Sequence, residues 1–99
     1  MLVGIWLLPG LGCDGALAES ARSFTREVNI DRSGNDIERV EMDPSAGIDA
    51  CEQLCRSNAA CVAFTYVKQS TTVPRPICRL KDQKPFGHQS SCCVSGVLK

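Results

Sequence analysis

Cysteine is the residue type whose number and spacing in this sequence could do chemistry. The chain of 99 residues contains seven, at Cys13, Cys51, Cys55, Cys61, Cys78, Cys92 and Cys93. Such dense use of cysteine in a short chain is typical of disulfide-bonded domains in an oxidising compartment. Structural zinc sites use paired Cys-x2–4-Cys knuckles, often with histidine, and only Cys51 and Cys55 have that spacing here. We therefore expect disulfides, no metal site and no cofactor.

An uncharged apolar run near the N-terminus accounts for the odd number of cysteines. Residues 2–11 are too few to cross a bilayer, which needs about 20 residues. They fit the apolar region of a secretory signal with a truncated basic segment, and Ala16-Leu17-Ala18 fits its cleavage pattern. A signal peptide over residues 1–18 would remove Cys13. The alternatives are a lipoprotein signal with Cys13 lipidated, or a buried N-terminal element. We expect a secreted or periplasmic protein with no stable membrane span and one domain over residues 19–99.

The elements that must position the other cysteines are predicted from hydrophobic periodicity. A helix is expected from about residue 47 to 57, because Cys51 and Cys55 recur with apolar side chains on one face. Ser45 or Asp43 would cap its N-terminus. Strands are expected in runs rich in apolar and β-branched residues, at residues 24–30, 36–42, 61–67, 77–82 and 92–99. One helix among about five short strands predicts a small α+β module.

Two disulfides from the helix to the rest of the domain follow if the helix buries its cysteine face. We favour the nested pairs Cys51–Cys78 and Cys55–Cys61, since only the turn after the helix separates Cys55 from Cys61. The chain has three phenylalanines and one tyrosine, and its single tryptophan lies in the expected signal. Because so small an apolar core stabilises a domain weakly, we expect folding to depend on the disulfides.

The adjacent Cys92 and Cys93 are the least settled part of the sequence. Neighbouring residues in a regular strand point to opposite faces, so a disulfide between them requires a distorted backbone. The alternatives are pairing of one of them with another cysteine of the domain, intermolecular pairing, or free thiols. A redox-active role would need a helix N-terminus or a cationic neighbour to lower the thiol pKa, and the sequence specifies neither.

No catalytic constellation is recognisable in the sequence. Acid–base and nucleophilic catalysis need a positioned base, and the single histidine, His88, has no motif around it. The acidic side chains of residues 36–42 fit an edge strand, where charge discourages strand addition. The oxygen-rich stretch 31–36 lacks the spacing of an EF-hand loop and is predicted to be a turn. We therefore expect a non-catalytic protein.

Charge is balanced in total but not along the chain. Eleven basic side chains cancel eleven acidic ones, which argues against nucleic acid as a partner. Residues 1–53 hold four basic and ten acidic side chains, whereas residues 54–99 hold seven basic and one acidic. One interpretation is internal complementarity between acidic early strands and basic later ones. The other is a face that binds an anionic polysaccharide or an acidic protein surface, with the candidate residues Tyr66, Lys68, Arg75, Arg79, Lys81 and Lys84.

Five pieces of the sequence form a recognisable set: the turn DRSGNDI, the helix with Cys-x3-Cys, the strands CVAFTYV and CRLKD, and the closing CCVSGV. Together, over residues 28–97, they resemble a PAN/apple domain of the bacterial secreted type. The resemblance implies one helix on a curved antiparallel sheet, held by two disulfides, in a non-catalytic module that binds proteins or carbohydrates. The sequence departs from the family at Ser33, where proline is common, and at Phe64, where tryptophan is common. It also lacks the early cysteine that links the termini of animal apple domains.

A different class of function stays open beside the binding module. The chain could be a small disulfide-rich secreted inhibitor or a structural protein of the envelope. An inhibitor presents a rigid exposed loop to its target, and residues 71–76 are the candidate segment. The sequence makes no prediction of oligomeric state.

Overall fold

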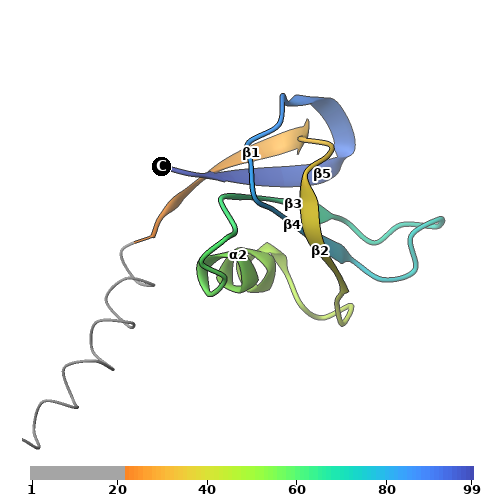
Figure 1. Cartoon of the computed structure of the whole chain (residues 1–99). Helices are drawn as coiled ribbons and strands as arrows, with labels where there is room; N and C mark the ends of the chain where they lie inside the picture. Colours follow the sequence, from red (N-terminus) through yellow and green to blue (C-terminus); the bar gives the residue numbers. More distant parts are fainter. Residues whose placement is uncertain (1–21) are drawn as a thin grey trace, which may run out of the picture.

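The structure, a computed structural model, describes residues 22–99. The expected signal peptide over residues 1–18, with Cys13, lies outside the described residues. The described elements follow one another in the order β1 Phe24–Asp31, β2 Asp36–Glu41, α2 Ile48–Arg56, β3 Ala63–Val67, β4 Ile77–Lys81 and β5 His88–Leu98 (Figure 1). One helix and one antiparallel sheet confirm the predicted α+β class. No helix within residues 22–99 is long and apolar enough to cross a membrane.

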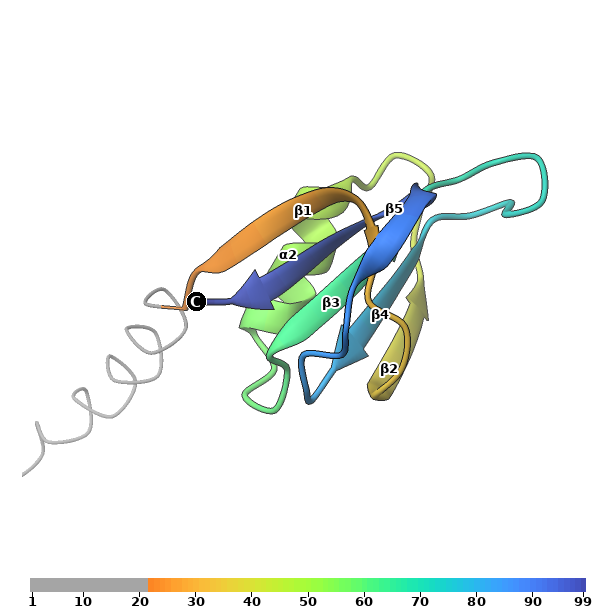
Figure 2. The same ribbon diagram turned by 90° about the horizontal axis from the view of Figure 1, so that it is seen from above.

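The connection between β1 and β2 determines the shape of the sheet. The five strands lie in the order β1-β5-β3-β4-β2, so β1 and β2 are at opposite edges, although only residues 32–35 join them. A flat sheet of this size would be about 19 Å wide, whereas the five Cα–Cα steps from Asp31 to Asp36 reach about 17 Å when fully extended. The sheet must therefore curl. Gly34 and Asn35, with φ of 102° and 60°, turn the chain, and Figure 2 shows the connection crossing the face opposite to α2.

The main core lies between α2 and the sheet. α2 contacts β3 and β4, and the buried side chains there include Phe64 and Leu80. Phe24 from β1 packs edge-on against Phe64, with ring centroids 5.8 Å apart. Tyr66 lies on the same face, because its hydroxyl donates a hydrogen bond to the Ala46 carbonyl at 3.3 Å. The alternation along β3 therefore points Phe64 and Tyr66 toward the helix and Thr65 away from it.

Two disulfides tie α2 down in the pairing favoured from the sequence. Cys51 is bonded to Cys78 in β4, and Cys55 to Cys61, with Cα–Cα distances of 5.4 and 5.2 Å. These four cysteines have no exposed surface. Their position beneath the helix follows from the one-turn spacing of Cys51 and Cys55, which places both thiols on the buried face.

Element boundaries differ from the sequence expectations by one or two residues at several ends, β3 beginning at Ala63 and not at Cys61, and by more at β5; the helix cap differs as well. The predicted caps Ser45 and Asp43 are wrong: Gly47 is the N-cap of α2 and makes no side-chain cap. Asp43 instead accepts a hydrogen bond from the backbone amide of Ser45 at 2.9 Å, so its carboxylate stabilises the turn before the helix. β5 begins at His88 and not at Cys92, because the end of β1 pairs with the added residues, Asp31 with His88 among them.

Gly96 makes room for the Phe64 ring in this core. The two residues are paired in the β3–β5 ladder, and a Cβ atom on Gly96 would overlap ring carbons of Phe64. We expect Gly96→Ala to lower the free energy of unfolding by about 2–3 kcal/mol, because overpacking forces a fully buried ring out of its position. Urea denaturation measures this loss. The double variant Gly96→Ala with Phe64→Leu should recover part of this loss, because the smaller side chain makes room for the added methyl group. If the losses of the two single variants simply add in the double variant, overpacking against the ring is not the cause.

Candidate functional site

The face of the sheet opposite to α2 has a polar centre that the β1–β2 connection covers. Thr65 and Ser95 have no exposed surface, and their hydroxyl oxygens are 2.8 Å apart. The Ser95 hydroxyl donates to the Ile30 carbonyl at 2.9 Å and accepts from the backbone amide of Arg32 at 3.3 Å. A single serine side chain in β5 thus holds the chain where it leaves β1.

The Arg32 side chain also holds this connection, through contacts with Glu27 and Pro85 that we call the Arg32 buttress. The guanidinium contacts both carboxylate oxygens of Glu27, at 2.7 and 3.0 Å, and donates to the Pro85 carbonyl at 2.6 Å. The hydrogen bonds from Arg32 hold the pKa of Glu27 below its usual value. A carboxyl with a lowered folded-state pKa contributes stability above its ordinary pKa and loses it as the pH falls through the lowered value. Acid therefore weakens this buttress.

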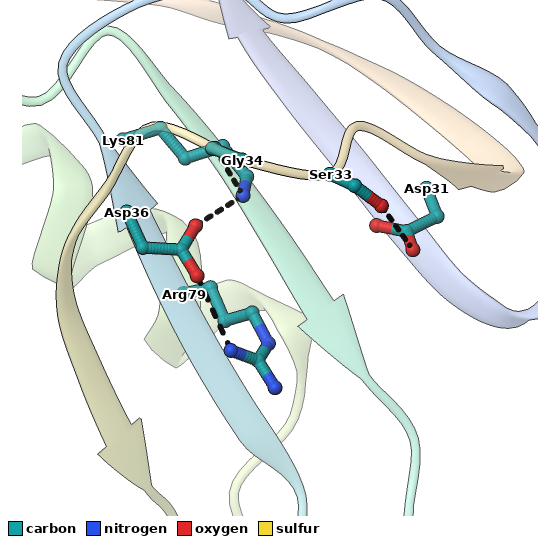
Figure 3. A pocket seen from close by; sticks show the side chains of 6 residues that line it. All are labelled: Asp31, Ser33, Gly34, Asp36, Arg79 and Lys81. Atoms are coloured by element: carbon teal, nitrogen blue, oxygen red, sulfur yellow. Dashed lines mark hydrogen bonds and ion pairs between the residues drawn. The ribbon is translucent and has the colours of Figure 1, made fainter.

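A polar hollow of about 210 Å³ opens beside the connection (Figure 3). It is lined by residues of β1, β2, β4 and the turn between β1 and β2: Asp31, Ser33, Gly34, Asp36, Arg79 and Lys81. The positive φ of Gly34 turns its carbonyl to accept a hydrogen bond from the Lys81 ammonium at 3.0 Å. On the opposite wall the Ser33 hydroxyl donates to Asp31 Oδ2 at 3.0 Å.

Asp36 is the electrostatic centre of this hollow. One of its carboxylate oxygens pairs with the Lys81 ammonium, and the other lies 3.2 Å from Nη1 of Arg79. The Lys81 side chain is 1% exposed, whereas that of Arg79 is 36% exposed. Lys81 is therefore part of the interior of the site, while Arg79 presents its guanidinium to solvent. The lining carries two acidic and two basic side chains, so it offers hydrogen-bond acceptors and donors together.

A second arginine stands beside Arg79 and was missed by the sequence analysis. Arg39 in β2 pairs directly with Arg79 in β4, so both side chains are on the face opposite to α2. Cβ atoms of directly opposite residues are about 5 Å apart, and like charges so placed repel each other. Each arginine is tethered to its own acid, Arg79 to Asp36 and Arg39 to Glu41 at 3.3 Å. This pair can be found only from the antiparallel register of β2 and β4, which the sequence does not give.

The six residues proposed from the sequence as one binding face do not lie together. Arg79 and Lys81 line the hollow, and Lys81 is buried, which removes it from any exposed basic surface. Tyr66 lies on the opposite, helix-covered face. Lys68 and Arg75 are exposed in the β3–β4 loop, and Lys84 donates to the Leu98 carbonyl at 2.7 Å. Strand alternation and the length of β4 separate residues that are close in sequence.

Internal complementarity between the acidic and basic halves of the chain is only part of the charge pattern. Asp36 from the acidic half pairs with Arg79 and Lys81 from the basic half. Other ion pairs lie within the acidic half: Arg26 contacts Asp49 and Glu52, and Arg32 contacts Glu27. The basic half therefore keeps exposed cations, Lys68 and Arg75 among them.

These features define a small α+β domain whose helix is disulfide-linked to a curled antiparallel sheet, with a polar hollow under the β1–β2 connection. Comparison with families of known proteins agrees with that class. A PAN domain model matches residues 30–81, more than half of the chain, and the chain belongs to the PAN domain family. The match includes the hollow and both nested disulfides, and it ends before β5. No curated protein and no solved structure gives a match. PAN domains are in general non-catalytic modules that bind proteins or carbohydrates, and disulfide-rich domains of this kind suit an extracellular setting.

Proposed function

We propose that this protein is a secreted or periplasmic binding module that takes an acidic carbohydrate at the polar hollow. The observation that carries the proposal is the cross-strand pair Arg39 and Arg79 next to the hollow. Each guanidinium gives one nitrogen, Nη1, to its neighbouring acid, Asp36 or Glu41, and the repulsion that remains between the two like charges favours binding of a further anion. Planar guanidinium groups bind carboxylates through two parallel hydrogen bonds, so the carboxylate of a uronic acid fits this pair.

The hollow supplies the contacts that a sugar ring needs beyond its carboxylate. Asp31 and Asp36 accept hydrogen bonds from hydroxyl groups, Ser33 donates or accepts them, and Arg79 donates them. The volume of about 210 Å³ suits part of a sugar residue. It is too small for a cluster of long side chains from a protein partner. The buried Lys81 and the Arg32 buttress hold the walls in place before binding, which lowers the entropy cost of recognition.

The test measures retention and affinity on an immobilised polyuronate, with neutral dextran as the comparison surface. We expect the protein to bind the polyuronate, with an affinity that falls as salt rises, and not to bind dextran. Arg79→Gln and Arg39→Gln should each weaken binding about tenfold to a hundredfold, the range for hydrogen bonds to charged groups. Glutamine removes the positive charge and keeps the aliphatic part of the side chain and an N–H donor, although it is shorter than arginine.

Lys84→Gln is the matched control, because it removes the same charge in the β4–β5 loop, away from the hollow. It should leave the affinity within about twofold of that of the parent, because Lys84 does not line the hollow and its ammonium is hydrogen-bonded to the Leu98 carbonyl. Equal losses in all three variants would mean that net charge and not the arginine pair drives retention. Unchanged binding of Arg79→Gln and Arg39→Gln would reject the proposed site.

The projecting β3–β4 loop favours a protease inhibitor as a second candidate function. The loop extends away from the sheet (Figure 2) and includes the segment 71–76 singled out from the sequence. Its tip is fastened by two backbone hydrogen bonds between Ser70 and Val73, at 2.9 and 3.2 Å, and by Gln69 donating to the Pro74 carbonyl at 3.0 Å. A panel of serine and cysteine proteases tests this candidate, and inhibition lost on replacing Thr71 and Thr72 with glycine would support it.

A further inference from the structure

The irregular part of β5 brings Cys92 and Cys93 close to Asp31 at the end of β1. The carboxylate of Asp31 and the sulfur atoms of Cys92 and Cys93 all lie within 4.8 Å of one another. The two sulfur atoms are in disulfide contact. This cluster lies outside the part of the chain that matches the PAN model, except for Asp31. Asp31 also lines the hollow, but the two cysteines do not, so their position beside it needs its own explanation.

The backbone around the cluster departs from regular pairing. Val28 pairs with Val94, but Ile30 pairs with Gln89, so Asn29 alone faces residues 90–93 of β5. Asn29 has a φ of 61°, in the left-handed region. Figure 1 shows β5 bending sharply along its length. Neighbouring side chains of a regular strand point to opposite faces, and this bulge gives Cys92 and Cys93 the distorted backbone that a bond between them requires.

We propose that Asp31, Cys92 and Cys93 form a redox-gated site for a thiophilic divalent cation such as Zn²⁺. Zn²⁺ binds thiolates and carboxylates in tetrahedral sites, and two thiolates favour it over hard cations that prefer oxygen. The Ser33 hydroxyl, 3.0 Å from Asp31 Oδ2, orients the carboxylate as outer-shell partners of metal ligands do. The fourth ligand is either water or His88, whose Nε2 is 4.0 Å from Asp31 Oδ2.

The gate is the bond between the two sulfur atoms. A small dithiol reductant transfers two electrons and two protons to the Cys92–Cys93 disulfide, which becomes two thiols while the reductant becomes a disulfide. Binding of one Zn²⁺ then displaces the two thiol protons to solvent and forms two zinc–thiolate bonds. A small disulfide oxidant restores the sulfur–sulfur bond: it takes two electrons from the two thiolates and, with two protons from solvent, becomes a dithiol. The Zn²⁺ is then released, because disulfide sulfur is a poor ligand for it.

The exposure of Cys92 makes this disulfide the one that a reductant reaches first, although Cys93 is buried. Cys92 is exposed, whereas the cysteines of the two nested disulfides have no exposed surface. Thiol–disulfide exchange requires attack on an accessible sulfur. Mild reduction therefore opens Cys92–Cys93 and leaves the helix tied to the sheet, so the domain stays folded while the metal site forms.

Titration with Cd²⁺ tests the proposal, because thiolate-to-cadmium charge transfer gives an ultraviolet band that reports sulfur ligands directly. The experiment uses the full chain carrying Cys13→Ser, so that no unpaired thiol contributes. After mild reduction and removal of the reductant, we expect two free thiols and one bound Cd²⁺ per chain, which a large excess of Zn²⁺ displaces. The oxidised chain should give no charge-transfer band. A band of equal strength before and after reduction, or none after it, would overturn the proposal.

The Asp31→Asn variant distinguishes a site in which the carboxylate is a metal ligand from one formed by the two thiolates alone. It should weaken Cd²⁺ and Zn²⁺ binding by about tenfold or more while keeping the charge-transfer band, and Asp82→Asn, in the loop after β4, should change nothing. Cys92→Ser together with Cys93→Ser should abolish binding, with unchanged circular dichroism as the check on folding. Equal affinity of Asp31→Asn and the parent would show that the carboxylate is not a ligand and would overturn the proposed site.

Discussion

Replacing Asp36 with alanine should destabilise the domain by about 2–3 kcal/mol, because it removes the carboxylate partner of a buried lysine. The Lys81 side chain is 1% exposed and cannot regain water without unfolding the β1–β2 connection above it. Breaking a buried ion pair by removing one partner costs about 3–5 kcal/mol. We expect a value at or below the lower end, because the Gly34 carbonyl still accepts one hydrogen bond from Lys81. Urea denaturation measures the loss.

Two further variants test the cause of this loss. Lys81→Met fills a similar volume without charge, and Asp36 keeps its contact with Arg79, so this change should cost about 1 kcal/mol or less. The double variant Asp36→Ala with Lys81→Met should be more stable than Asp36→Ala alone. Glu41→Ala, in the same strand and in an exposed ion pair with Arg39, is the control and should cost less than about 1 kcal/mol. Equal losses for Asp36→Ala and Glu41→Ala would contradict a buried-charge explanation.

Removal of the Cys51–Cys78 disulfide, by replacing both residues with alanine, should lower the free energy of unfolding by about 3–4 kcal/mol. The disulfide closes a loop with a sequence separation of 27, and the entropy of the unfolded chain that it removes corresponds to that amount. A domain with so few large apolar side chains has little stability to spare, so we expect the variant to be largely unfolded at 37 °C. Circular dichroism during heating under non-oxidising and non-reducing conditions measures the effect.

The shorter disulfide is the internal comparison. Cys55–Cys61 closes a loop with a separation of 6, for which the same relation gives about 2 kcal/mol. Both pairs are equally buried and both begin on α2, so the variants differ mainly in loop length. A larger loss on removing Cys55 and Cys61 than on removing Cys51 and Cys78 would show that packing in the folded state, and not loop closure, determines the contribution of these disulfides.

The helix and the nested disulfides could be predicted because they depend on local periodicity. Cys51 and Cys55 are one helical turn apart, so both must face the same side, and only the turn after the helix separates Cys55 from Cys61. The strands of the sheet were also indicated by local composition. The start of β5 could not be predicted, because pairing with the end of β1 extends the strand to His88.

The composition of the binding site could not be predicted, because it depends on which strands become neighbours. Arg39 and Arg79 are forty residues apart and meet only through the β2–β4 register. Lys81 looked like one more exposed cation, and its burial arises because the β1–β2 connection crosses the sheet above it. Tyr66 and Arg79 were grouped by sequence, but strand alternation places them on opposite faces.

The meeting of Asp31 with Cys92 and Cys93 was beyond sequence inspection for the same reason. A distorted backbone was expected if the two cysteines were bonded, but nothing local indicates that the bulge turns them toward the end of β1. Asp31 was assigned only to a turn. Its three possible partners, Ser33, His88 and the vicinal cysteines, become visible once β1 and β5 are paired.

The pairing of the first and last strands also determines how the domain responds to mechanical tension. Phe24 pairs with Leu98, and the Lys99 amide donates to the Ser23 carbonyl at 2.9 Å, so the chain enters and leaves at one corner (Figure 1). Force on the two ends therefore peels β1 from β5 one pair at a time instead of shearing the whole ladder. Unravelling from the N-terminal side stops at Cys51, where the covalent link to Cys78 carries the load past α2 and β3. Under tension the domain lengthens at its edges, while residues 52–77, which the disulfide bypasses, carry no load.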